Sequence, residues 1–426
     1  MDNRISALAD FLDRSVSSYH AIAALSEELA KEGYTLLSEK GNWNLVPGSK
    51  YYMKRNGTSL MAFRVPQASP KGFLLTASHC DRPGFKVKEN PELKNAYIRL
   101  AVERYGGMLM STWLDRPLSV AGRVLVETED GVETKLVNID RDLLLIPNVA
   151  IHMNRQANDG YKWNPASDML PLFGSKDTAG KFATLLEEAA GGKVLGHDLS
   201  LYVRQKTTIW GSEEEFISST ALDDLACAWC CTQGFLNASE SENMPILCVF
   251  DNEEVGSSSL QGADSDLLEV VLERICTALD LNKNQMLAQS FMLSADNAHA
   301  IHPNHPEFAD PNNAPVMNQG VVLKFNANQR YTTDGVSAAI FRKICAKANV
   351  PVQTYCNRAD LAGGSTLGNI SLTHVSVPSA DIGLPQLAMH SCYETAGTQD
   401  VLYMEDALTT FYSTTLTCVD GNYFLK

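Results

Sequence analysis

Asp251-Asn252-Glu253-Glu254-Val255-Gly256 follows directly on the apolar run from Pro245 to Phe250. The run has the length and composition of a buried strand. Carboxylates this close together repel one another, so they must face water or a multivalent cation. A solvated acidic loop is the ordinary interpretation, but ligands in open α/β sheets bind just beyond the carboxyl ends of strands. The stretch therefore predicts an α/β fold with a metal site where this strand ends.

Length and composition limit the class of protein. The 426 residues suffice for two domains, or for one large domain that carries an insertion. A formal net charge of -15 argues against nucleic acid or an anionic membrane as partner, and no apolar run approaches the roughly 18 residues that a membrane span needs. The amino terminus lacks the pattern of a secretory signal, so the ten cysteines are expected to be reduced thiols in a cytoplasmic protein.

A second cluster of polar residues follows another predicted strand. The pattern from Gly72 to Ala77 is typical of a strand, and His79 and Asp81 come directly after it. A single histidine in such a place is usually structural. With a carboxylate two positions further on, His79 can instead bind a metal while Asp81 holds the orientation of its ring.

Three more candidate ligands lie at or just after apolar elements. Asp223 opens a helical pattern, where an acidic residue is ordinary because it complements the helix dipole. Asp296 follows a short predicted strand, Ser290 to Ser294, and His390 comes late in the chain. With His79 and Glu254 they form a nitrogen and oxygen set that zinc accepts and that cobalt or manganese can also occupy.

Such a set suits two ions with one shared carboxylate. Two ions about 3.5 to 4 Å apart lower the pKa of a water and polarise a carbonyl. Neighbouring side chains of an extended loop point in different directions, so Glu253 and Glu254 can divide the work between metal binding and proton transfer. The residues alone leave open which of the two does which.

The middle of the chain has a different residue pattern. Short β-like runs recur between about residues 91 and 212, for example Met108 to Thr112, Gly122 to Glu127 and Thr134 to Ile139. This part contains no cluster of metal-binding residue types, and we expect an inserted domain over 91–212 within a catalytic domain made of 1–90 and 213–426. His152 is its least ordinary residue, although the sequence by itself does not distinguish it from a solvent-exposed or core histidine.

The remaining segments fit an α/β domain. Their patterns predict amphipathic helices over Arg4 to Leu12 and His20 to Glu32, strands over Val321 to Asn326 (which contains Lys324) and His374 to Pro378, and a helix over Gly335 to Lys347 with Asp334 as its cap. The glycine-rich loop Ala362 to Gly368 lacks the lysine of a phosphate-binding loop, so we interpret it as backbone that approaches the site.

Five separated motifs carry a resemblance to a known family. They are His79-Cys80-Asp81-Arg82-Pro83-Gly84, Leu222-Asp223-Asp224, Asp251-Asn252-Glu253-Glu254-Val255-Gly256-Ser257, Ser294-Ala295-Asp296-Asn297-Ala298-His299 with the residues up to Asn304, and Gln386-Leu387-Ala388-Met389-His390-Ser391. In this order they resemble the aspartyl aminopeptidase family of metallopeptidases. The resemblance implies an α/β fold in which a mixed-sheet dinuclear zinc exopeptidase domain is interrupted by a β-rich dimerisation domain, and an assembly of twelve chains.

The resemblance also implies roles for individual residues. It makes Glu253 the catalytic base, supported by Asp81, and Asp223 the bridging ligand. The other implied ligands are His79, Glu254, Asp296 and His390. In the family, the segment similar to that around His152 reaches into the active site of a neighbouring subunit. Lys324 and Tyr331 are placed beside the substrate, where Lys324 is the best candidate to attract an acidic amino-terminal residue; a solvated lysine is the alternative.

The implied activity is removal of the amino-terminal residue from peptides by a homo-oligomeric enzyme with no nucleic-acid or membrane partner. A related dinuclear deacylase or carboxypeptidase can use nearly the same metal set and is the alternative enzyme class. A non-catalytic assembly protein would require a decayed site, whereas all five ligands and Glu253 are present.

Overall fold

The computed structural model describes residues 2–361 and 363–426. Its largest element is a nine-stranded sheet with the order β1-β2-β3-β13-β4-β14-β18-β16-β17. Parallel pairs such as β13 with β4 combine with antiparallel pairs such as β13 with β3, so the sheet is mixed, as predicted. Its strands are β1 (Thr35–Leu36), β2 (Lys50–Arg55), β3 (Ser59–Arg64), β4 (Phe73–His79), β13 (Met244–Phe250), β14 (Phe291–Ala295), β16 (Val321–Phe325), β17 (Val352–Cys356) and β18 (Ser379–Gly383).

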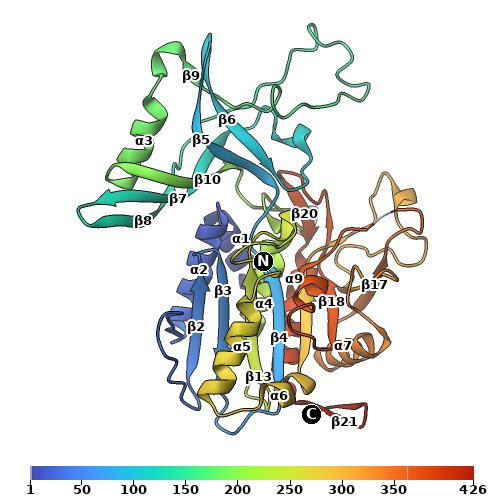
Figure 1. Ribbon diagram of the computed structural model, residues 1–426. Helices are drawn as coiled ribbons and strands as arrows, with labels where there is room; N and C mark the ends of the chain where they lie inside the picture. Colours follow the sequence, from blue (N-terminus) through green and yellow to red (C-terminus); the bar gives the residue numbers. More distant parts are fainter. Residues whose placement is uncertain (1, 362) are drawn as a thin grey trace.

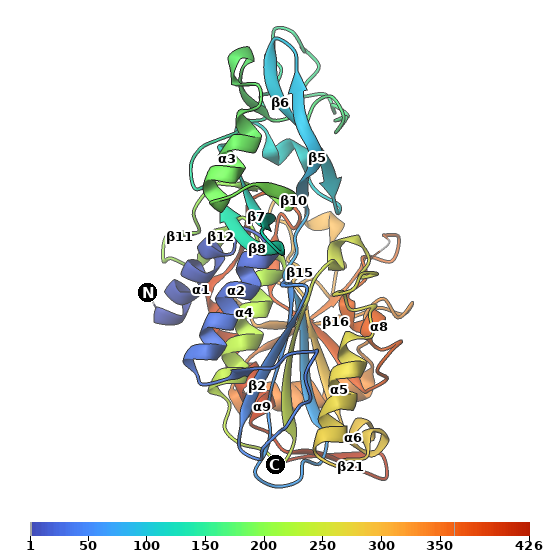
Figure 2. The same ribbon diagram turned by 60° about the vertical axis from the view of Figure 1, so that its left-hand side comes forward.

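Helices cover both faces of this sheet (Figure 2). On one face the apolar core is closed by α1 (Asn3–Arg14), α2 (Ser18–Lys31), α4 (Leu222–Asn237), α7 (Gly335–Ala348) and α9 (Thr398–Tyr412). On the other it is closed by α5 (Leu267–Ala278), α6 (Lys283–Ala288) and α8 (Leu367–Ser371). Because both faces are covered, the central strands are buried throughout. All seven residues of β13 are buried, as its unbroken apolar run predicts.

A second sheet stands beyond the edge at which β4 ends (Figure 1). It has six strands in the order β8-β7-β10-β5-β6-β9 and its own apolar core, which α3 (Lys181–Ala190) helps to close. Its strands are β5 (Gly84–Lys94), β6 (Tyr97–Tyr105), β7 (Leu118–Thr128), β8 (Gly131–Asn138), β9 (Leu172–Ser175) and β10 (Val194–Val203).

Two smaller sheets complete the structure. The five-stranded sheet has the order β11-β12-β20-β19-β15, and a two-stranded sheet follows α9. The strands are β11 (Thr208–Trp210), β12 (Phe216–Ser219), β15 (Ala298–His299), β19 (Pro385–Leu387), β20 (Glu394–Gly397), β21 (Leu416–Val419) and β22 (Asn422–Leu425). Within the described ranges, no helix combines the length and apolarity that crossing a bilayer requires.

Two predicted strands are absent from the described structure. The run Met108 to Thr112 forms a turn and a 3-10 helix, Met110–Trp113, closed by the bond from the Thr112 N–H to the Leu109 carbonyl. The run His374 to Pro378 continues the turn after α8, where the Val375 N–H binds the Ser371 carbonyl, and pairing begins only at β18. Val375 and Val377 of the second run are buried without belonging to a strand, whereas Leu109 of the first run is 50% exposed, so a β-like run of apolar residues did not by itself predict strand pairing.

Candidate active site

The ends of the central parallel strands place the predicted ligands together. His79 is the last residue of β4 and pairs in register with Phe250, the last residue of β13. The acidic stretch from Asp251 follows β13, and Asp296 follows β14, which pairs with the other side of β4. All five predicted ligands and Glu253 line one cavity of about 330 Å³. The cavity lies at the edge of the sheet where the sequence placed a metal site.

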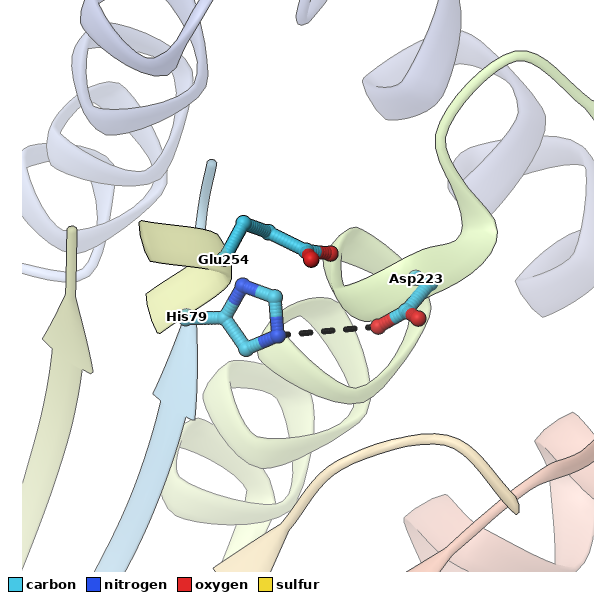
Figure 3. Close-up of side chains that lie close together, drawn as sticks. All are labelled: His79, Asp223 and Glu254. Atoms are coloured by element: carbon cyan, nitrogen blue, oxygen red, sulfur yellow. Dashed lines mark ion pairs between the residues drawn. The ribbon is translucent and has the colours of Figure 1, made fainter. Parts of the chain in front are cut away.

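Asp223 lies at the centre of this group. Its Oδ1 is 3.5 Å from His79 Nε2 and its Oδ2 is 3.5 Å from His390 Nε2 (Figure 3 shows the contact with His79). Glu254 Oε2 lies 3.3 Å from the same His390 nitrogen. Asp223 belongs to both clusters of side chains whose ligand atoms lie within 4.8 Å of one another, namely His79 with Asp223 and Glu254, and Asp223 with Asp224 and Asp296. A carboxylate in that position suits a bridge between two ions.

The buried oxygens of this site fit a cation. Asp223 Oδ1, Asp224 Oδ1 and Glu254 Oε1 are inaccessible to solvent and have no hydrogen-bond partner among the described residues. A buried carboxylate oxygen without a partner is costly unless a positive charge compensates it. The donor set of imidazole nitrogens and carboxylate oxygens is one that zinc accepts.

Asp224 was not predicted as a site residue, because its position in a first helical turn is ordinary for an acid. Its side chain is fully buried, and its Oδ2 accepts the backbone N–H of His79 at 3.1 Å. Asp224 therefore fixes the end of β4 against the start of α4. The only local signal was its place beside Asp223.

Glu394 is a second functional candidate that the sequence did not indicate. This buried residue begins β20. One of its oxygens accepts the Asp223 N–H at 2.9 Å, and the other accepts the His390 N–H at 2.8 Å. A single carboxylate thus holds the backbone of two predicted ligands that are far apart in the chain.

Asp81 connects His79 with the acidic loop. Asp81 Oδ1 is 3.3 Å from His79 Nδ1. The same carboxylate accepts the backbone N–H groups of Glu253 at 3.0 Å and Glu254 at 3.1 Å, and the hydroxyl of Tyr105 at 2.6 Å. Burial alone would raise the pKa of Asp81, but His79, Tyr105 and the Glu254 N–H lower it below its ordinary value. Asp81 is therefore an ionised residue that orients its neighbours.

Asp81→Asn should weaken zinc affinity or activity by about 10- to 100-fold, because an amide cannot accept all of these hydrogen bonds. Zinc titration of the metal-free protein, together with peptide hydrolysis at saturating zinc, measures both. The matched control is Asp400→Asn, since Asp400 is also a buried carboxylate that accepts two backbone N–H groups but does not line the cavity. Unchanged affinity and rate in Asp81→Asn would remove Asp81 from the site.

Glu253 begins a 3-10 turn, Glu253–Val255, and lines the cavity. Its side chain keeps 13% exposure, more than that of Glu254 at 4%. Its Oε2 lies 4.0 Å from His79 Nε2, and burial raises the pKa of the Glu253 carboxyl well above its ordinary value. A carboxylate that is partly open to solvent and has a raised pKa suits proton transfer.

Lys324 and Tyr331 line the same cavity. Lys324 is only 2% exposed, which excludes the alternative of a solvated lysine. Its Nζ donates to the carbonyls of Asp296 at 2.8 Å and Asn297 at 3.2 Å, and lies 5.2 Å from the centre of the Tyr331 ring. The ammonium therefore remains charged inside the cavity and fixes the strand end that carries Asp296.

The glycine-rich loop and His152, also singled out in the sequence, differ in their position relative to the cavity. Gly364, Ser365 and Thr366 of the glycine-rich loop line the cavity, as predicted, whereas Ala362 of that loop lies outside the described residues. A long loop, residues 147–171, leaves the second sheet (Figure 1). His152 belongs to this loop by its number, is exposed, and is not among the described residues that line the cavity.

Comparison with known proteins identifies the family of the chain. Residues 11–412 match the family described as "Aminopeptidase I zinc metalloprotease (M18)". The chain is 43% identical to "Probable M18 family aminopeptidase 2" of Clostridium novyi (strain NT), over 97% of this chain and 100% of that relative.

Solved structures show the same fold. The cryo-EM structure of the Ape4 and Nbr1 complex superimposes with a TM-score of 0.92 and 34% identity, over 96% of this chain and 85% of that one. The S. cerevesiae mApe1 dodecamer gives a TM-score of 0.84 at 28% identity, with 96% of each chain covered. The fold class and the resemblance expected from the sequence are confirmed, and the chain belongs to the M18 family of zinc-dependent aminopeptidases.

Proposed function

We propose that Asp223 would be a ligand of both of two zinc ions. Glu254 and His390 would complete the ligand set of one ion, and His79 and Asp296 that of the other. The 3.3 Å separation of Glu254 Oε2 and His390 Nε2 supports their assignment to the same ion. The observation that carries the proposal is the convergence of five ligands and Glu253 on one cavity. When bound, zinc supplies Lewis-acid chemistry, which polarises a carbonyl and lowers the pKa of water.

In this proposal Glu253 is the general base. It takes the proton from the attacking water and delivers it to the amine that leaves with the shortened peptide. Asp81 holds the backbone N–H groups of Glu253 and Glu254, so that one carboxylate faces the substrate while the next binds metal. The cavity of about 330 Å³ suits the end of a peptide.

We further propose that acidic amino-terminal residues are preferred. Two of the three N–H donors of Lys324 bind the carbonyls of Asp296 and Asn297, and Asp296 Oδ2 lies 3.5 Å from the same nitrogen, so the remaining donor can be shared between Asp296 and a substrate carboxylate. Tyr331 flanks the ammonium and limits the space around it. A hydrogen bond to a charged group contributes about 1.5–3 kcal/mol, so Asp should be preferred to Asn by about 10- to 100-fold.

The test is a panel of dipeptides that differ only in the first residue, assayed on the zinc-loaded enzyme. Asp and Glu are compared with the isosteric Asn and Gln, and each free amine with its acetylated form. We expect hydrolysis of free-amine substrates only, with the acidic member of each pair preferred. Equal rates for Asp and Asn would contradict the specificity, and equal rates for acetylated peptides would point to a deacylase.

We also propose a homo-oligomer, with residues 91–212 as the assembly domain and twelve chains as its size. The dodecamer of the similar mApe1 supports this. So does the loop that carries His152, on which Val149, Ile151 and Met153 are exposed apolar residues. Apolar side chains gathered on one loop favour contact with another protein surface. His152 is proposed to act in the cavity of the neighbouring chain.

A cytoplasmic location is likewise a proposal. All ten cysteines are free, as expected for reduced thiols, and most are buried, among them Cys227, Cys230 and Cys231 on α4. Free thiols in this number are typical of a reducing compartment.

A further inference from the structure

A short segment of the second sheet reaches into the metal site. Tyr105 is the last residue of β6, and Gly106 and Gly107 follow it. Each of the three contacts a different predicted site residue, although the region that contains them was expected to form the inserted dimerisation domain. Their contacts are with Asp81, Glu254 and His390, respectively.

Tyr105 acts on the carboxylate that organises the acidic loop. Its hydroxyl donates to Asp81 Oδ2 at 2.6 Å and accepts from Asn252 Nδ2 at 2.8 Å. Asp81 in turn accepts the N–H groups of both loop glutamates. Tyr105 therefore ties the end of β6 to the start of the acidic loop and to the residue that faces His79.

Gly106 leaves room for Glu254. Its φ is +70°, a conformation that favours glycine. A Cβ at this position would lie 3.2 Å from both the Cβ and the carbonyl oxygen of Glu254. Any side chain here would consequently push the predicted ligand aside by a few tenths of an ångström.

Gly107 orients the second histidine. Its carbonyl accepts from His390 Nδ1 at 2.6 Å. With the proton on Nδ1, the lone pair of His390 lies on Nε2, the atom that faces Asp223 and Glu254. The Leu109 N–H also binds the His390 carbonyl at 3.0 Å, so the backbone of this histidine is held from the same side.

We propose that Tyr105, Gly106 and Gly107 form a positioning element of the zinc site, which sets zinc affinity through Asp81, Glu254 and His390. The inference rests on the ligands assigned under the proposed function. None of the three residues is assigned a chemical step. The element lies between the two sheets, so the placement of the second sheet against the first becomes a determinant of metal binding, in addition to any role in assembly.

The experiment compares Gly106→Ala with Gly191→Ala. Gly191 has nearly the same φ, +69°, and ends α3 in the same region, but a Cβ there meets nothing within 4 Å among the described residues. Both substitutions place alanine at nearly the same positive φ, and only Gly106→Ala brings a Cβ against Glu254. We expect Gly106→Ala to bind zinc about 10- to 100-fold more weakly than wild type, and Gly191→Ala to bind it as wild type does.

Zinc affinity is measured by titration of the metal-free protein, so the result does not depend on which peptides are cleaved. Tyr105→Phe is a second variant, which keeps the ring and removes the hydroxyl, and circular dichroism and thermal unfolding confirm that each variant is folded. We expect Tyr105→Phe also to weaken zinc binding, and excess zinc to restore much of its activity. Wild-type zinc affinity in Tyr105→Phe and Gly106→Ala, or an equal loss in Gly191→Ala, would overturn the proposal. A wild-type protein that binds zinc but cleaves no peptide would instead refute the proposed function.

Discussion

Glu253→Gln should reduce kcat by about 10²- to 10⁴-fold while two equivalents of zinc remain bound. The amide preserves the shape of the side chain but cannot accept the proton of the attacking water, and general acid–base catalysis contributes about that factor. Glu253 lines the cavity and its side chain is more exposed than that of Glu254, as expected for a residue that meets substrate. Metal analysis of the purified variant and steady-state hydrolysis of a free-amine dipeptide give the two measurements.

Glu254→Gln is the matched control, since it makes the same isosteric change one residue further along. Glu254 contacts His390 Nε2, and its buried Oε1 has no hydrogen-bond partner among the described residues, so its replacement should lower the zinc content as well as the rate. If Glu253→Gln loses one equivalent of zinc and Glu254→Gln retains both, the two roles are reversed.

His152→Ala should lower turnover by about 10²- to 10³-fold, even though His152 does not line the described cavity of its own chain. The expected cause is the loss of one hydrogen-bond donor to the oxyanion of the tetrahedral intermediate in a neighbouring chain. His152 is exposed beside Met153, which is 83% exposed, so this loop is accessible to a second copy. Steady-state hydrolysis by the assembled variant measures the loss.

Mixing two inactive variants distinguishes action between chains from action within one. After subunit exchange between His152→Ala and Glu253→Gln, some sites combine an intact Glu253 with an intact His152 from the neighbour, so activity should return. A mixture of Glu253→Gln with Glu254→Gln is the control, because every active site in it still carries one of the two substitutions. Without recovery in the first mixture, despite verified exchange, His152 would serve its own chain or none.

The second sheet thus has two separate connections with catalysis. Tyr105, Gly106 and Gly107 contact the metal site of the same chain, whereas His152 is proposed to serve the neighbouring one. Zinc affinity reports the first connection and subunit exchange the second. Variants of the two kinds should therefore be separable, since changes at Gly106 act on metal binding and changes at His152 act on turnover with zinc in place.

The sequence by itself determined the class of fold and the five candidate ligands that the structure brings to one cavity. Each candidate lies at or just after an apolar element, and parallel strands end at one edge of their sheet, so local patterns suffice to bring such residues together. The pairing of His79 with Phe250 in register confirms that geometry. The unbroken apolar run of β13 likewise predicted a strand with both faces covered.

Only the tertiary structure decided which residues hold the ligands in place. Glu394 binds the N–H of Asp223, which lies 171 positions earlier in the chain, and Asp81 binds the N–H of Glu253, 172 positions later. Hydrogen bonds over such separations cannot be recognised from a sequence pattern, because their donors are backbone N–H groups that every residue except proline carries. The sequence also did not predict that Lys324 is buried. The free-energy cost of removing its ammonium from water is offset by two backbone carbonyls and the carboxylate of Asp296. The local sequence pattern thus specifies where candidate ligands come together, and long-range packing specifies which side chains hold those ligands in position.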